Sequence, residues 1–463
     1  MTVDFSPNTI HCGDNLEILK SIPDGVVDLC YIDPPFYSKR NHKDVSKKTS
    51  EVRGFQDTWS GDKQNYLDFM KPRVEEIFRV LKPNGSFYLH CDISAVFHLK
   101  VICDEVFGPE GFLNDIVWKR HSSSKNTSRN YASIADHILF YAKGSDYTFH
   151  MQYTPIDEKV FNLVEKETGR RFRSQPLVVS GETDKKEFNF GGRIYTLKEG
   201  KRLKWTQETI DKRLKKNPRL IYWTKSGDPR YKTYLDERKG IMLSAIWTDI
   251  KLITSTSSER LGYPTQKPIK LMRRILNASS NEGDVVLDVF CGSGTTLVAA
   301  KELKRNFIGI DASPTACRLT ASRIGYPEGK IIGYPQTKEE FSRLPDFEFV
   351  NWVSGKMNST QKAKLKKLGI EAVCKHSNVP IFIQNSEMDD SFDSTMLEKS
   401  IKNLDAEKHA VIVIVAHDFS GKVKNAIDEW KKETNLEIIT YTIEDLANNK
   451  HFLDKVSVKE TLF

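Results

Sequence analysis

Short apolar runs alternate with amphipathic stretches in the first third of the chain and again after residue 267. Continuous runs such as 26–32 predict strands buried on both faces, and apolar spacings of three and four residues predict helices. This alternation predicts an α/β fold with a mostly parallel sheet and helices on its faces. The predicted strands are 10–14, 26–32, 86–91, 115–118, 137–141, 284–290 and 307–310; the predicted helices are 15–22, 66–81, 95–107, 269–279 and 297–304, with a turn at 82–85.

The rhythm breaks between residues 142 and 262, which are basic and rich in Trp and Tyr. This change predicts an inserted subdomain. A third block, with apolar runs at 410–415 and 436–440 around a helix at 422–433, predicts a small α/β domain of its own. The predicted organisation is a first half of the main domain at 1–141, the insert at 142–262, the second half at 263–335 and the C-terminal domain at 344–463.

Charge is concentrated in the insert. Residues 119–262 hold 29 Lys and Arg against 17 Asp and Glu, a net charge of +12, whereas the whole chain of 463 residues carries +8. A positive segment in an otherwise slightly acidic protein favours a polyanion such as nucleic acid as the partner, although a solvated basic surface gives the same pattern. The aromatic residues of the insert would either stack on bases or form its small core.

Bulk composition indicates an ordinary globular protein, with 39% hydrophobic and 29% charged residues. No apolar run has membrane-spanning length, and the first residues do not resemble a signal peptide, which predicts a cytoplasmic protein without membrane contact. The seven cysteines are scattered without a CxxC pair. They predict reduced thiols and no metal site.

Asp33-Pro34-Pro35-Phe36 directly follows the predicted strand 26–32. Two consecutive prolines fix φ and remove two backbone donors, so neither helix nor ladder continues there. The loop is therefore stiff and offers one carboxylate, free carbonyls and one ring. These groups suit a flat substrate with an N–H to be accepted, although a Pro-Pro pair alone is more often only a rigid loop.

A glycine-rich turn joins strand 284–290 to the next helix and spans Asp288–Thr296, with glycines at 292 and 294. Such a turn exposes amides at a helix N-terminus. The following strand ends at Asp311, seventeen positions after Gly294, where a carboxylate can accept from both ribose hydroxyls. Together these features predict a nucleoside-containing cofactor, and the missing third glycine disfavours NAD. Asp14 would either lie beside the same pocket or cap the next helix.

Three motifs in one order now resemble a known family. Asp33-Pro34-Pro35-Phe36, then Tyr263-Pro264-Thr265-Gln266-Lys267-Pro268, then Phe290-Cys291-Gly292-Ser293-Gly294 resemble the β group of DNA amino-methyltransferases, whose chain is circularly permuted. The resemblance covers roughly residues 8–326. It implies a Rossmann-like methyltransferase sheet, S-adenosyl-L-methionine as cofactor, double-stranded DNA as substrate, and an insert that recognises the target. It further implies a possible homodimer and a cognate restriction endonuclease.

Site residues follow from the resemblance position by position. The catalytic loop is Asp33, Pro34, Pro35 and Phe36. The DNA-binding candidates are Lys119, Arg120, Arg202, Lys204 and Lys212. The residues implied for the cofactor are Asp14, Asp33, Thr265, Gln266, Lys267, Pro268, Asp288, Phe290, Gly292, Gly294, Thr295 and Asp311.

The expected chemistry is transfer of a methyl group to an exocyclic amine, whose lone pair is delocalised into the base. Acceptance of its N–H bonds by the Asp33 carboxylate and the Pro34 carbonyl favours a pyramidal nitrogen, and Phe36 would stack on a base flipped out of the duplex. The resemblance implies N6 of adenine as the target, because position 33 is acidic and the N4-cytosine enzymes of the family often carry serine there; N4 of cytosine is the alternative. No Pro-Cys dipeptide is present, which argues against C5-cytosine chemistry.

The C-terminal block resembles more weakly an appended, restriction-endonuclease-like domain. Gln384 stands where such a nuclease needs a lysine, which predicts a degenerate domain without cleavage activity; an unrelated small α/β domain is the alternative. Two other functions stay open at this point. The chain would be a DNA-binding specificity subunit if its cofactor pocket were vestigial, or a bifunctional protein if the nuclease were active.

Overall fold

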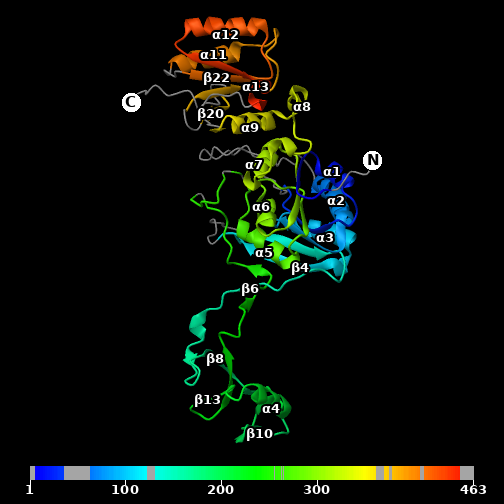
Figure 1. Ribbon diagram of the computed structural model, residues 1–463, viewed down its shortest axis with the longest axis vertical. Helices are drawn as coiled ribbons and strands as arrows, with labels where there is room; N and C mark the ends of the chain where they lie inside the picture. Colours follow the sequence, from blue (N-terminus) through cyan, green and yellow to red (C-terminus); the bar gives the residue numbers. More distant parts are fainter. Residues whose placement is uncertain are drawn as a thin grey trace. The chain divides into compact units, whose positions relative to one another are not determined.

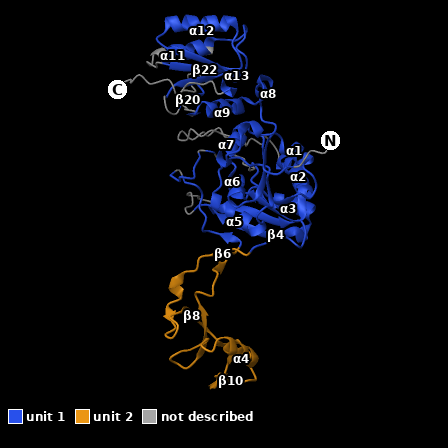
Figure 2. Cartoon of the chain, viewed as in Figure 1, with its two compact units in different colours: residues 1–150, 245–463 blue, residues 151–244 orange. Residues whose placement is uncertain are grey.

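The computed structural model describes residues 6–35, 63–121, 131–254, 256–261, 263, 265–360, 370–374, 378–406 and 411–448. The chain divides into two compact units, which we call unit 1 (residues 1–150 and 245–463) and unit 2 (residues 151–244) (Figure 2). Residues 142–150 and 245–262, placed in the insert by the sequence, group with unit 1. Phe36 lies outside the described residues.

The larger sheet of unit 1 is mixed but mostly parallel. Only the pairs β3–β5 and β5–β4 are antiparallel, and the other neighbours in the sheet run parallel. This is the Rossmann-like arrangement that the family resemblance implies. In spatial order the strands are β1 (Thr9–Cys12), β18 (Asn306–Asp311), β17 (Val285–Asp288), β2 (Val27–Ile32), β3 (Leu81–Cys91), β5 (Ala135–Ala142), β4 (Phe112–Lys119) and β16 (Ile246–Trp247).

Helices cover both faces of this sheet (Figure 1). Apolar residues of α2 and α3, such as Val74, Ile77 and Leu99, are fully buried in one core cluster with strand residues such as Cys30 and Leu89. The burial of both faces explains why the central strands are continuous apolar runs. The helices are α1 (Asn15–Ser21), α2 (Lys63–Val80) and α3 (Val96–Phe107) on one side, and α5 (Ile269–Ser279), α6 (Thr295–Glu302) and α7 (Pro314–Ile324) on the other.

One local expectation was wrong, and one helix was missed. The predicted turn at 82–85 lies inside β3, where the pairing with β2 shifts register between Val27–Leu81 and Leu29–Ser86. Neighbouring strands therefore hold the Pro-Asn-Gly segment as an irregularity of the ladder, and it does not end the strand. Helix α7 was not predicted. It begins with Ser313 as N-cap and Pro314 at its first position and ends at Gly325, all of which are ordinary helix-boundary signals.

Unit 2 is built from short strands, one α-helix and a single 3-10 turn. Its small core consists of residues such as Phe188, Phe190 and Ile210, with Trp205 and Trp223 packed against them. The aromatic residues of the insert therefore serve largely as its core. The elements are β6 (Tyr153–Thr154), β7 (Leu163–Val164), β8 (Arg171–Pro176), β9 (Val178–Ser180), β10 (Glu187–Phe190), β11 (Arg193–Thr196), β12 (Lys201–Leu203), α4 (Gln207–Lys216), β13 (Ile221–Trp223), β14 (Pro229–Tyr234) and β15 (Ile241–Met242).

The C-terminal residues of unit 1 form a second sheet of five strands with a core of their own, in which Ile412, Ile414 and Leu404 are buried. Strands β21, β22 and β23 run parallel, whereas β19 and β20 are antiparallel. The elements are α8 (Lys338–Ser342), α9 (Asp346–Lys356), β19 (Ser359–Thr360), β20 (Ala372–Cys374), β21 (Pro380–Ile383), α11 (Thr395–Ala406), β22 (Val411–Ala416), α12 (Gly421–Glu433), β23 (Glu437–Thr442) and α13 (Ile443–Ala447).

Candidate functional site

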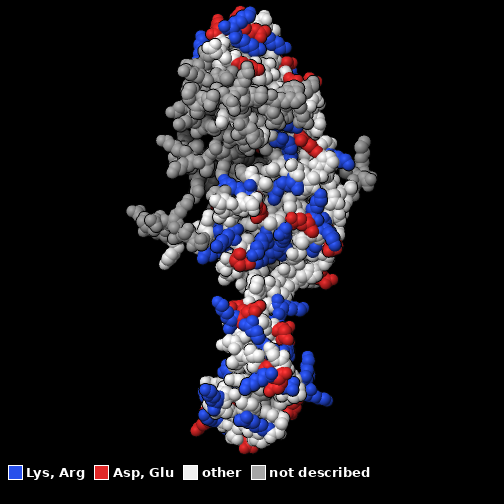
Figure 3. Space-filling model, turned by 60° about the vertical axis from the view of Figure 1, so that its left-hand side comes forward, with Lys and Arg blue, Asp and Glu red and all other residues white. Residues whose placement is uncertain are grey.

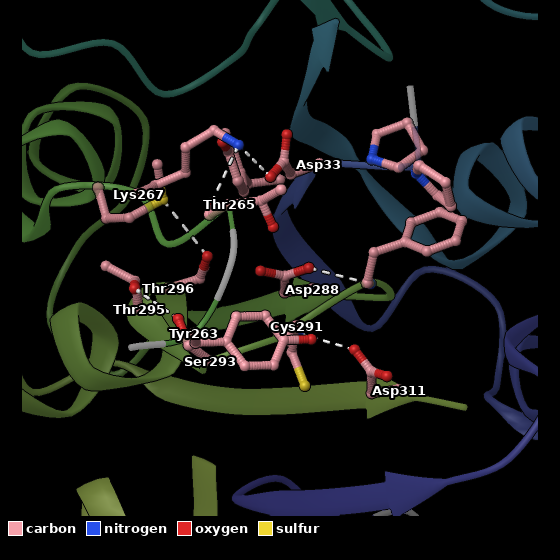
Figure 4. A pocket seen from close by; sticks show the side chains of 16 residues that line it. Asp33, Tyr263, Thr265, Lys267, Asp288, Cys291, Ser293, Thr295, Thr296 and Asp311 are labelled. Atoms are coloured by element: carbon pink, nitrogen blue, oxygen red, sulfur yellow. Dashed lines mark hydrogen bonds and ion pairs between the residues drawn. The ribbon is translucent and has the colours of Figure 1, made fainter. Parts of the chain in front are cut away.

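A pocket opens where the carboxyl ends of β2, β17 and β18 meet, which is the usual ligand position in a sheet of this kind. Ten residues expected from the sequence line it, namely Asp33, Pro34, Pro35, Thr265, Lys267, Asp288, Phe290, Gly292, Thr295 and Asp311. The other lining residues are Tyr31, Tyr263, Met272, Cys291, Ser293 and Thr296. Asp33 and Lys267 lie on one side of the pocket and Asp311 lies on the opposite side, with Asp288 and the Tyr263 ring between them (Figure 4).

Asp311 is tied to the glycine turn. Its Oδ2 accepts the Gly292 N–H at 2.8 Å and its Oδ1 accepts the Ser313 N–H at 2.9 Å. The side chain is buried, yet a carboxylate has about four lone-pair positions, so two remain for a ligand. Gly292 has φ of +50°, and a Cβ there would touch the Tyr263 ring at 3.4 Å. The turn therefore presents backbone directly to the pocket beneath an aromatic ring.

Asp33 lies between two basic side chains. The Lys267 ammonium donates to Asp33 Oδ2, and its side chain is only 9% exposed. Asp33 Oδ1 is buried without a hydrogen-bond partner among the described residues, 3.9 Å from His90 Nδ1. Thr265, two residues before Lys267, has φ of +63°, a left-handed conformation that costs energy for a β-branched residue. The position of the carboxylate is thus set by groups distant in sequence.

Sequence reasoning missed the buried polar group behind Asp33. His90 Nδ1 lies 2.8 Å from the Tyr31 hydroxyl, its Nε2 lies 3.3 Å from Asp136 Oδ2, and the ring packs edge-on against Trp118. His90 and Asp136 are almost completely buried. A histidine within the apolar strand 86–91 was the available signal, because buried polar side chains need partners.

Burial shapes the electrostatics of the pocket. It raises the pKa of Asp288 to about 7, despite hydrogen bonds from Thr296 and the Phe290 N–H, and that of Asp311 to about 6. A ligand with positive charge near these carboxylates would stabilise their ionised forms. A nucleoside with a cationic sulfur fits this set of groups: a carboxylate for ribose hydroxyls, a glycine cradle under an aromatic ring, and acidic groups for the cation.

Four of the residues implied for the cofactor do not line the pocket. Asp14 is the N-cap of α1, since its Oδ1 accepts the Leu16 N–H at 2.8 Å, while its Oδ2 pairs with Arg73 at 3.0 Å. Strand β1, which precedes Asp14, does pair with β18, the neighbour that a position of Asp14 beside the pocket would require. Gln266 holds the preceding loop through the Leu261 N–H and the Glu259 carbonyl. Pro268 and Gly294 are the N-cap residues of α5 and α6.

The expected DNA-binding side chains differ in their surroundings. Arg202, Lys204 and Lys212 are exposed on unit 2. Lys119 is also exposed, at the end of β4 in unit 1, but Arg120 is half-buried with Nε 3.2 Å from Asp136 Oδ1. Arg120 therefore helps to neutralise the buried carboxylate next to His90. On the face of the molecule drawn in Figure 3, basic side chains are interspersed with acidic ones.

Comparison with known proteins gives the family. Residues 27–322 match the N6/N4 methyltransferase family model, described as DNA methylase. The chain is 31% identical over 337 residues to the type II methyltransferase M.EcaI of Enterobacter cloacae, covering 72% of each protein. It is 28% identical to the DNA adenine methyltransferase YhdJ of Escherichia coli, covering 68% of this chain and 82% of that one. The solved PvuII cytosine-N4-specific DNA methyltransferase covers 71% of this chain and 93% of its own, with 16% identity and a TM-score of 0.38.

These matches show that the chain belongs to the N6/N4 family of DNA methyltransferases, whose methyl donor is S-adenosyl-L-methionine. The family includes enzymes for adenine N6 and for cytosine N4. The family match ends at residue 322 and does not extend to the C-terminal sheet. Among the helices that the structure describes, none combines the length and apolar character needed to cross a membrane. The described residues also hold no group of three or more His, Cys, Asp and Glu side chains suited to a metal ion.

Proposed function

We propose that this protein methylates the exocyclic N6 of adenine in double-stranded DNA, at a specific sequence and on a base flipped out of the helix. The observation that carries the proposal is the pocket at the ends of β2, β17 and β18. The Asp33-Pro34-Pro35 loop lines it together with the glycine turn at Gly292 and the carboxylate of Asp311. The first group matches acceptance of an amine, and the second matches binding of a nucleoside. A transfer reaction needs both within one pocket.

The reaction assigns a distinct task to each group of side chains. When bound, S-adenosyl-L-methionine supplies an electrophilic methyl group on a sulfonium. Asp311 and the Gly292 turn would hold its ribose, while Asp288 lies where it can face the positive end of the donor. Asp33 has lone pairs beyond the one used by Lys267, so it can accept an N–H of the target amine together with the Pro34 carbonyl. Lys267 would keep the carboxylate in place for that contact.

The base is assigned to adenine because position 33 is acidic. In the family pattern, enzymes for cytosine N4 often carry serine there, so cytosine is the second candidate. The test is methylation of duplex DNA by the purified protein, followed by mass spectrometry of the nucleosides. N6-methyladenine is the expected product. Detection of N4-methylcytosine alone would contradict the assignment to adenine but leave the methyltransferase reaction intact.

Cofactor binding should be linked to proton release. The pKa of Asp288 is raised to about 7, so close to half of the molecules carry a protonated Asp288 at pH 7. A bound sulfonium favours the ionised carboxylate and lowers this pKa; binding should therefore release about half a proton at pH 7, and affinity should rise between about pH 6 and 8. Calorimetry in two buffers of different ionisation enthalpy measures the release. Asp288→Asn should abolish most of it, and an unchanged release in that variant would contradict the role of Asp288.

We propose that unit 2 recognises DNA. It holds 22 Lys and Arg against 13 Asp and Glu, a net charge of +9, which exceeds the charge of the entire chain. Because Trp205 and Trp223 pack in its core, phosphate contacts by exposed basic side chains are the better-supported means of binding. Which base edges it reads is a separate question, decided by side chains in the groove.

The salt dependence of binding tests this role. Replacing Arg202, Lys204 and Lys212 with alanine should weaken DNA binding and reduce the slope of log affinity against log salt by about 0.9 for each phosphate that is no longer neutralised, hence by about 2 to 3. Fluorescence anisotropy over a series of salt concentrations measures this slope. Lys304→Ala, which removes an exposed lysine of unit 1 that pairs with Glu282, serves as the control. An unchanged slope in the triple variant would remove these side chains from the DNA interface.

The cytoplasmic location, the homodimer and the cognate restriction endonuclease implied by the family resemblance stay predictions. So does a degenerate nuclease in the C-terminal domain. In that domain Gln384 Nε2 donates to the Ser386 hydroxyl at 2.9 Å, so the side chain at the expected lysine position is engaged in a local hydrogen bond. Cleavage of plasmid DNA in the presence of magnesium would contradict the predicted lack of nuclease activity.

A further inference from the structure

The C-terminal domain packs directly on the methyltransferase part of unit 1. Its helix α9 contacts α7, the helix that follows the strand ending in Asp311. Phe349 and Trp352 of α9 are fully buried, and the Trp352 indole donates to the Tyr334 hydroxyl at 3.2 Å. At Gly355 an added Cβ would come within 1.8 Å of Arg318 Nη2, so the flexible end of this α7 side chain reaches the surface of α9 there.

One side chain of α9 reaches the support of the pocket. Glu348 is only 5% exposed, and its Oε2 accepts from the Ser313 hydroxyl at 2.9 Å. Ser313 caps α7, since its Oγ accepts the Ala316 N–H at 3.3 Å, and its own N–H donates to Asp311 Oδ1 at 2.9 Å. A continuous chain of hydrogen bonds therefore runs from the C-terminal domain through Ser313 to the carboxylate expected to bind ribose.

An apolar residue would be the ordinary occupant of such a buried position, because an acidic group loses its hydration there. Burial raises the pKa of Glu348 to about 7, with Asp311 as a further cause. Glu348 also determines the direction of the Ser313 hydroxyl hydrogen: with the hydrogen directed to Glu348, a lone pair remains for the Ala316 N–H. Without Glu348 the hydroxyl is free to rotate, and the loop that presents Asp311 loses one of its anchors.

We propose that Glu348 is a positioning residue for the methyl donor, which acts through Ser313 to hold Asp311 in the orientation that accepts the ribose hydroxyls. The C-terminal domain then forms part of the support of the cofactor site and is more than an appended module. This inference rests on the proposed function of the pocket.

Calorimetry with S-adenosyl-L-methionine and the full-length chain tests the inference. Glu348→Leu fills the same space without an acceptor and should raise Kd about tenfold, the usual effect of removing one hydrogen bond to an ionisable group. Glu348→Gln keeps an acceptor oxygen and should stay within about threefold of the wild type. Ser313→Ala removes the link from the other side and should also weaken binding, which provides a second measurement if Glu348→Leu does not fold.

Trp352→Phe is the matched control. It removes a hydrogen bond on the same helix and in the same interface, but one that does not lead to Asp311, so affinity should not change. Equal weakening by Trp352→Phe and Glu348→Leu would overturn the inference in favour of general docking of the domain, as would unchanged affinity in both Glu348→Leu and Ser313→Ala. Absence of binding by the wild type, with and without DNA, would instead reject the proposed function of the pocket, and the inference with it.

Discussion

Asp33→Ala is expected to reduce methyl transfer by about a thousandfold or more while S-adenosyl-L-methionine still binds within about threefold of the wild-type Kd. The substitution removes the carboxylate that would accept the target amine at the end of β2. It does not change Asp311 or the glycine turn to which Asp311 is hydrogen-bonded, on the other side of the pocket. Single-turnover assays on duplex DNA measure the chemical step, and calorimetry measures cofactor binding.

Two further variants separate chemistry from stability. Asp33→Ala removes the carboxylate that pairs with the Lys267 ammonium, which is 9% exposed, and loss of the counter-charge of a mostly buried cation destabilises a fold. Asp33→Ala combined with Lys267→Met removes that charge and should be equally inactive. Asp33→Asn keeps one acceptor oxygen and should retain more activity than Asp33→Ala. Near wild-type activity in a folded Asp33→Ala variant would show that the carboxylate does not hold the amine.

Asp311→Asn is expected to weaken binding of S-adenosyl-L-methionine by about a hundredfold, equivalent to about 3 kcal/mol. Both carboxylate oxygens accept backbone N–H groups, from Gly292 and Ser313. An amide has only one acceptor atom, so its NH₂ group would face one of these donors. The turn must then shift, and the ribose hydroxyls lose their charged acceptor at the same time. Calorimetry gives the affinity, and thermal unfolding with and without the cofactor gives an independent measure.

Asp28→Asn is the control for this substitution. Asp28 is mostly buried near the beginning of β2, pairs with Lys82 at 2.8 Å and accepts the Val285 N–H at 2.8 Å. Its replacement should lower thermal stability through the same kind of contact but leave cofactor affinity unchanged, because it does not line the pocket. Equal decreases of affinity in the two variants would show that general destabilisation of the sheet causes the loss, and Asp311 would then have no special role in binding.

Local patterns predicted much of the sheet because its strands are buried on both faces. Strand β2 was expected at 26–32 and spans Val27–Ile32, and the expected helix 269–279 matches α5. The prediction of a turn at 82–85 was wrong. Its Lys-Pro-Asn-Gly sequence is typical of turns, yet neighbouring strands hold the segment within the ladder of β3. For Asp14, the sequence left two roles open, a contact with the ligand or the N-cap of the next helix. In the structure its carboxylate caps α1 and pairs with Arg73.

Short-range chemistry is enough to specify the order of strands and loops, the Pro-Pro loop after β2, the glycine turn after β17 and the acidic end of β18, because apolar periodicity and turn preferences act over a few residues. The surroundings of Asp33 and Asp311 depend instead on how the folded chain packs. Lys267 lies 234 positions after Asp33 in the sequence, and His90 lies 57 positions after Asp33. Glu348, from the C-terminal domain, hydrogen-bonds to Ser313, which in turn holds Asp311. Such contacts depend on which strands pair and which helices pack, and these long-range choices leave no local pattern in the chain.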